Sequence, residues 1–244
     1  MQPRLLLQLF HRAQVDEDVY TIHRNFVSAW IGVAGPFGLP ASFEDDDPVM
    51  PEGELVAVKH LKIPGGKNRY SFKYKFRSEK FLTKDASAFD DVVTCQLKIE
   101  ESQYSDLLHV WLPKFAASFK CYRAQVSMSE YAFDFTDWGW NEWSGRPTTN
   151  PVYHRIKNGA GVDIDGRNNI FTLHPAMFWD EELCVNALGF GATEVERRIK
   201  KDASHVELIN GGIHIVLSTK LQMSFEDYVE MNKHFGRLLD IGGY

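Results

Sequence analysis

A strict two-residue alternation over residues 69–76 is the feature that most limits how this chain can fold. Aromatic side chains occupy every second position and alternate with basic or small polar ones: Tyr70, Phe72, Tyr74 and Phe76 against Arg69, Ser71, Lys73 and Lys75. Successive side chains of a β-strand point to opposite faces of its sheet, so the pattern predicts a strand with one buried face and one wet face. Such strands belong to antiparallel or mixed sheets.

Other segments predict further strands around this one. The run 5–10, apolar except for Gln8, indicates a central strand buried on both faces. Runs of β-forming residues indicate strands over 54–63, 92–99, 121–128 and, more briefly, 170–173. The strongest hairpin signal joins 206–209 to 213–217 through Asn210, Gly211 and Gly212, because left-handed turn positions favour Asn and Gly.

Apolar residues at helical spacing predict helices between the strands. The expected helices cover 20–31, 102–118 with Pro113 as a kink or an end, 175–188, a segment opened by a capping box at Thr193 and Glu196, and a last helix opened by Ser224. The predicted fold class is therefore α/β of the α+β type, with a mixed, mainly antiparallel sheet flanked by helices.

One segment interrupts every periodic pattern. Residues 137–151 are rich in Trp, Gly and Pro, a composition typical of a junction between structural units. Residues 1–244 are expected to form either one continuous unit or two packed lobes, 1–136 and 152–244, that meet at this segment.

Composition limits the classes of function. The 244 residues carry a formal net charge of −6, which gives no broad attraction for nucleic acid and suits a basic protein partner instead. Cys95, Cys121 and Cys184 lie far apart and are odd in number, so they are expected to be buried thiols in a reducing compartment. The apolar run near the amino terminus is too short for a signal peptide or a membrane span, so a cytoplasmic location without membrane contact is expected.

Familiar catalytic and cofactor motifs do not occur in the sequence, so no catalytic residue, metal or cofactor is expected. The enzymatic alternative is a small metal-dependent hydrolase built from the 154–174 segment. Its ligands would be His154, Asp163, Asp165 and His174, which are residue types that bind hydrolytic metals, although their spacing does not define a site.

Two groups of residues are candidates for binding a protein partner. Glu44, Asp45, Asp46 and Asp47 form an acidic run in a long proline-containing loop, where they are either solvated or poised to enter a basic groove on a partner. Trp138, Trp140 and Trp143 are either core residues at the junction or an exposed cluster of the kind that anchors interfaces.

The second half of the chain resembles a known bacterial family. Residues 174–184, from His174-Pro175 through Trp179-Asp180 to Cys184, are similar to the polymorphic-toxin immunity family called Immunity protein 52. The similarity continues through Ala187-Leu188-Gly189 to residues 210–217, and extends only loosely over the first 150 residues.

This resemblance implies a non-catalytic immunity protein that binds and neutralises a cognate toxin. The toxin would be a nuclease effector delivered by a type VI secretion system. Inhibition would occur either by covering the active face of the toxin or by blocking its assembly.

Overall fold

The computed structural model describes residues 4–31, 33, 38–39, 68–75, 77, 82, 86–128 and 165–241, together with the backbone of residues 56–62. These residues build one eight-stranded sheet with the order β2-β3-β4-β1-β5-β6-β8-β7. Every pairing between its neighbouring strands is antiparallel, so the predicted α+β class with a mainly antiparallel sheet is confirmed. The strands are β1 (Arg4–Arg12), β2 (Val56–Lys62), β3 (Arg69–Lys75), β4 (Asp90–Lys98), β5 (Arg123–Met128), β6 (Ala176–Asp180), β7 (His205–Ile209) and β8 (Gly212–Val216).

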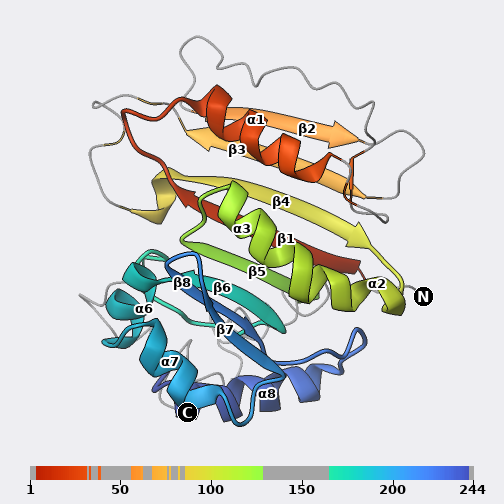
Figure 1. Ribbon diagram of the computed structural model, residues 1–244, viewed down its shortest axis with the longest axis vertical. Helices are drawn as coiled ribbons and strands as arrows, with labels where there is room; N and C mark the ends of the chain where they lie inside the picture. Colours follow the sequence, from red (N-terminus) through yellow and green to blue (C-terminus); the bar gives the residue numbers. More distant parts are fainter. Residues whose placement is uncertain are drawn as a thin grey trace, which may run out of the picture.

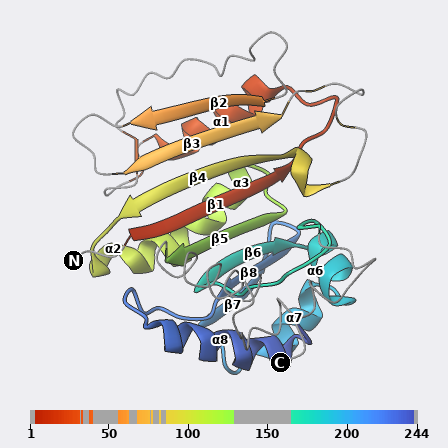
Figure 2. The ribbon, with the colours of Figure 1, turned by 180° about the vertical axis from the view of Figure 1, so that it is seen from behind.

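Helices cover the two ends of the sheet differently (Figure 1). Helix α1 (Val19–Trp30) and the run α2 (Glu101–Asp106), π segment (Leu107–Trp111) and α3 (Leu112–Ser118) lie over one face. The helices α6 (Glu181–Leu188), α7 (Ala192–Ile199) and α8 (Phe225–Leu238) gather at the β6-β8-β7 end, as the view from behind shows in Figure 2. Within the described residues, no helix is both long and apolar enough to cross a membrane.

The alternation over residues 69–76 has the expected consequence. Tyr70, Phe72 and Tyr74 are buried, and they face the helical layer of α1 and α3. The rings of Trp30 and Tyr70 lie 4.8 Å apart edge to face, and Trp30 also contacts Phe115 at 4.9 Å. Aromatic packing of this kind supplies much of the apolar area that holds a helix on a sheet.

The central strand β1 differs from its prediction. Leu5, Leu7 and Leu9 are fully buried, but the residues between them are only half-buried, so β1 has one fully covered face rather than two. The physical reason is that α1 and α3 cover only one face of this part of the sheet.

Residues 175–188 are also not one helix as predicted. Ala176–Asp180 form the strand β6, and the helix α6 begins only at Glu181. A short apolar run suits either structure. Here β6 pairs with β5 on one side and β8 on the other, and the Asp180 side chain then caps α6 by accepting a hydrogen bond from Leu183 N at 2.7 Å.

The short strand predicted at 170–173 does not form. Asn232 of α8 takes the place of a strand partner, since its side chain accepts a hydrogen bond from Leu173 N at 2.7 Å and donates one to Leu173 O at 3.0 Å. The capping box predicted at Thr193 and Glu196 is absent as well. Helix α7 starts at Ala192, whose N–H donates to the Glu181 carboxylate at 2.9 Å.

The other predicted elements are confirmed. The hairpin β7-β8, the helix α1 and the helix α8 capped by Ser224 all form, and the structure adds an Asp18 cap to α1. Pro113 neither ends its helix nor breaks it, and a π segment precedes α3 instead. Because Pro113 has no N–H to offer the preceding turn, a wider turn is accommodated there. All three cysteines are free and buried.

Candidate functional site

The residues expected to contact a partner lie outside the described residues. This holds for the acidic run Glu44, Asp45, Asp46 and Asp47 and for Trp138, Trp140 and Trp143. It also holds for His154 and Asp163 of the hydrolase alternative.

The two remaining members of that alternative are engaged in structural contacts. The Asp165 carboxylate accepts hydrogen bonds from Ser87 N at 2.9 Å and from Arg167 N at 2.8 Å. His174 is buried, and its Nδ1 lies 3.2 Å from the hydroxyl of Tyr228. In the part of the chain that the structure describes, neither belongs to a group of three or more side chains spaced to hold a metal ion.

Two neighbouring aspartates of β4 are buried on opposite faces of the sheet. The Asp90 carboxylate accepts hydrogen bonds from Arg167 Nε at 2.6 Å and from the Tyr122 hydroxyl at 2.5 Å. Asp91 accepts hydrogen bonds from Arg77 Nη1 at 3.0 Å and from Lys75 N at 2.8 Å. Burial raises the pKa of Asp90 to about 6, against the opposing effects of Tyr122 and Arg167. Each buried carboxylate therefore has an arginine partner, as buried charges require.

A third ion pair lies at the same edge of the sheet, where β1 and β6 end and β4 begins. Arg12 at the end of β1 contacts the Asp180 carboxylate, and its guanidinium carbon lies 4.3 Å from the centre of the Tyr122 ring. Asp180 also caps α6, so one carboxylate links β1, β6 and a helix. These contacts brace the sheet and leave little of their charge available for chemistry.

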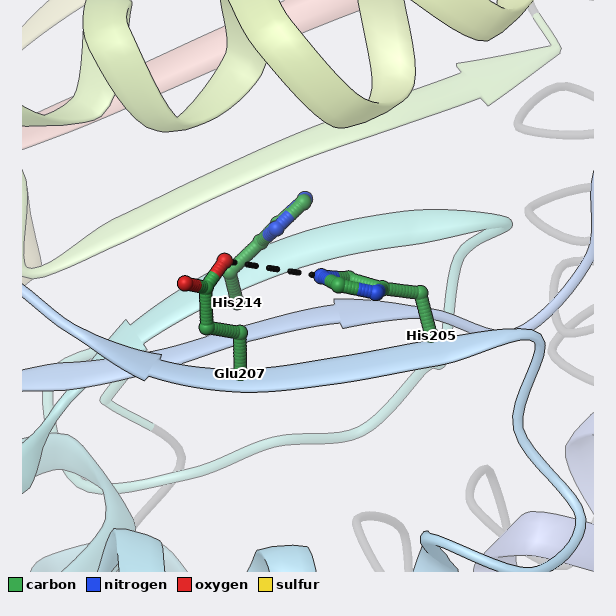
Figure 3. A group of neighbouring side chains, drawn as sticks. All are labelled: His205, Glu207 and His214. Carbon is green, nitrogen blue, oxygen red and sulfur yellow. Dashed lines mark ion pairs between the residues drawn. The ribbon is translucent and has the colours of Figure 1, made fainter.

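A different polar cluster lies on the β7-β8 hairpin. His205, Glu207 and His214 each offer one ligand atom, and the three atoms lie within 4.8 Å of one another (Figure 3). His205 and Glu207 alternate along β7 and so share a face, while Glu207 lies directly opposite His214 on β8. The closest pair is His205 Nε2 and Glu207 Oε2 at 3.5 Å.

Burial differs sharply within this cluster. The side chains of His205 and Glu207 are 37% and 57% exposed, whereas His214 is fully buried. Neither ring nitrogen of His214 makes a hydrogen bond with the residues that the structure describes. Burial lowers the pKa of His214 to about 4, and the neighbouring His205 acts in the same direction against the opposing effect of the Leu108 backbone, so the ring is neutral at pH 7.

The π segment, Leu107–Trp111, packs against this cluster. His109 of this segment packs edge to face on His205, with ring centres 5.3 Å apart. Burial and the nearby His205 lower the pKa of His109. Three imidazoles therefore meet between the π segment and the β7-β8 hairpin, and π turns recur at functional sites.

Sequence analysis missed this cluster, although a signal for it was present. A two-residue turn at Asn210 and Gly211 fixes the register of the hairpin, and this register places residue 207 opposite residue 214. The pattern His205-Val206-Glu207 then puts a second imidazole on the same face. The position of His109 above the hairpin follows only from the tertiary structure.

Comparisons with known proteins concern the fold. No protein-family model matches the chain, and no curated protein matches it. Among solved structures, the chain is similar to the Pseudomonas aeruginosa T6SS protein PA0821, with a TM-score of 0.55 and 11% sequence identity over 98% of this chain and 73% of that chain. At this identity the likeness shows a shared fold.

Proposed function

We propose that this chain is an immunity protein that binds and neutralises a cognate bacterial toxin. The observation that carries the proposal is the fold likeness, over almost the whole chain, to a T6SS protein. The resemblance of residues 174–217 to an immunity family points the same way. The partner would be a nuclease effector of a type VI secretion system, and the chain would act in the cytoplasm, where such a toxin meets its substrate.

The buried charges support binding rather than catalysis as the mode of action. Asp90 and Asp91 are each held by an arginine, and Asp180 is held by Arg12 while it caps a helix. Removing either partner of such a buried pair would leave an uncompensated charge, so these carboxylates have a structural role. A binding protein needs such a braced scaffold and no reacting group.

The contact residues belong to the proposal. The acidic run Glu44, Asp45, Asp46 and Asp47 would meet the basic groove in which a nuclease holds phosphates, and Trp138, Trp140 and Trp143 would anchor the interface. The chain would cover the active face of the toxin or block its assembly. Both modes use the same contact chemistry.

The experiment that tests the proposal is co-expression with the product of the neighbouring gene. A stable complex that co-purifies, together with rescue of cells from that product, is the expected result. If the chain neither binds that product nor rescues cells from it, the immunity proposal is refuted.

The acidic run has a test of its own, made on the resulting complex. Reversing all four charges to lysine should slow toxin association at low salt, by roughly 10-fold or more, because charge complementarity acts mainly on the association rate. A matched control reverses four exposed acids on helices, namely Glu101, Asp106, Glu226 and Glu230. Equal association rates for the two variants would remove the acidic run from the interface while leaving the immunity proposal standing.

A further inference from the structure

We propose that His205, Glu207 and His214 form a binding site for a zinc-class divalent metal ion on the β7-β8 hairpin. None of the three is among the residues assigned to toxin binding, and the site departs from the expectation that the chain binds no metal. Its ligand set is two imidazoles and one carboxylate, a combination that holds Zn²⁺ in proteins.

The first argument is the geometry of the three side chains. In tetrahedral zinc sites, ligand atoms lie about 2.0–2.1 Å from the metal and hence about 3.4 Å from each other. His205 Nε2 and Glu207 Oε2 already lie 3.5 Å apart. The full set spans at most 4.8 Å, and rotation of the two partly exposed side chains can close that difference.

The second argument is the state of His214. Its imidazole is fully buried, and neither ring nitrogen makes a well-aligned hydrogen bond among the residues described, the nearest backbone group being that of Leu108. A buried polar group without a hydrogen-bond partner destabilises the folded state, so native proteins seldom retain one without a reason. A metal ion held between His214 and the two β7 side chains would give one nitrogen its missing partner.

The third argument is the setting of the cluster at the sheet edge. β7 is the last strand of the sheet, and Glu207 lies on its exposed side, so an ion can enter from solvent. Figure 3 shows the three side chains rising from the same face of the hairpin, with His214 extending toward the helical layer. A strand pair held in register by its turn is a rigid support, which metal sites need.

The ligand count predicts the character of the site. Three protein ligands leave one tetrahedral position open for water or for a group from a bound molecule. Imidazole nitrogens favour Zn²⁺ over Mg²⁺, which prefers oxygen ligands and retains its waters.

The test is a metal titration of the full chain after treatment with EDTA and dialysis. Calorimetry with Zn²⁺ should show one ion bound per chain, and Co²⁺ in its place should give the intense visible bands of a four-coordinate site. His205→Ala and Glu207→Gln should each lower zinc affinity at least about 10-fold, since even groups that only support metal ligands have effects of that size. Both residues are partly exposed, so these variants should fold, and far-ultraviolet circular dichroism checks that they do.

A matched control comes from α8. His234 is 53% exposed, and its Nε2 lies 3.7 Å from Asp202 Oδ1, so it is a surface histidine beside an acid, and no group of three ligands among the described residues includes it. His234→Ala should leave zinc affinity unchanged. Zinc should also raise the thermal midpoint of the wild-type chain but not that of the His205→Ala, Glu207→Gln double variant.

Three outcomes would overturn the inference. These are no zinc binding by the wild-type chain, equal binding by the wild-type chain and the double variant, and a response to Mg²⁺ as strong as that to Zn²⁺. Each can be observed without knowledge of the toxin, so the metal site and the immunity proposal stand or fall separately.

Discussion

His174 shows how burial changes the chemistry of one residue. The ring is buried against Tyr228, and burial lowers its pKa to about 3, with the nearby Arg123 acting in the same direction. An imidazole in this state is neutral at every pH at which the chain would function. The same residue type on an exposed turn would titrate near pH 6.5.

The low pKa predicts a pH dependence of stability. In the unfolded chain His174 takes up a proton below about pH 6.5, whereas in the folded chain it does so only near pH 3. Its contribution is therefore fully present above pH 6.5 and is lost as the pH falls toward 3. At pH 5 the loss is about 2 kcal/mol.

Denaturant unfolding of the wild-type chain and of His174→Asn at pH 7 and pH 5 measures this effect. Asparagine can still hydrogen-bond to Tyr228 but does not titrate, so the fall in unfolding free energy between the two pH values should be about 2 kcal/mol smaller in the variant. His234→Asn, at an exposed histidine, is the control and should retain the wild-type fall. An identical fall in wild type and His174→Asn would contradict the buried, neutral assignment.

The β7-β8 hairpin is the element in which turn chemistry and packing can be separated. Asn210 and Gly211 have φ values of 54° and 72°, the left-handed conformation that this turn requires. Gly212 follows them and pairs with Asp180 of β6. A Cβ atom at Gly212 would lie 2.1 Å from the Trp179 carbonyl oxygen, whereas a Cβ at Gly211 would meet nothing within 4 Å.

These two glycines give a matched pair of substitutions. Gly211→Ala should cost about 1–2 kcal/mol, because only the left-handed conformation is penalised. Gly212→Ala should cost about 3 kcal/mol or more, because the clash is with backbone and the β6-β8 pairing must shift. Chemical denaturation of both variants measures the difference, and equal losses would show that Gly212 is not closely packed on β6.

Residues 175–188, predicted as one helix, illustrate where the prediction of elements from sequence fails. Residues 176–179 form a short apolar run that suits either a helix or a strand. The two neighbouring strands β5 and β8 decide the outcome, and both are remote in the sequence. Residues 170–173 fail for a related reason, since Asn232 of α8 satisfies the backbone that a strand partner would have satisfied.

At the scale of the whole molecule, one sheet joins both halves of the chain. Strand β5 of the first half pairs with β6 of the second half, and the buried apolar residues of the two halves belong to one core cluster. We therefore expect a single cooperative unfolding transition rather than two separate ones.

Two conservative core substitutions test this expectation. Phe26→Leu in α1 and Ile215→Val in β8 lie at opposite ends of the sheet, and both residues are fully buried. Each should lower the stability of the whole chain by roughly 1 kcal/mol, with tryptophan fluorescence and far-ultraviolet circular dichroism shifting together in guanidinium. Two resolved transitions, with each variant moving only one, would show that the halves unfold independently.

The sequence by itself determined the mainly antiparallel class of the sheet, the strand over residues 69–75, the presence of the β7-β8 hairpin, helix α1 and the capped helix α8. These features depend on contacts between residues close in the sequence, namely alternation, turn conformation and capping. Tertiary structure alone decided that residues 176–180 form a strand and that β1 has a single covered face. It also decided the burial of Asp90 and Asp91 on opposite faces of the sheet and the packing of His109 on His205. Those outcomes depend on which distant segments pair and which faces the helices cover, and no local pattern contains that information.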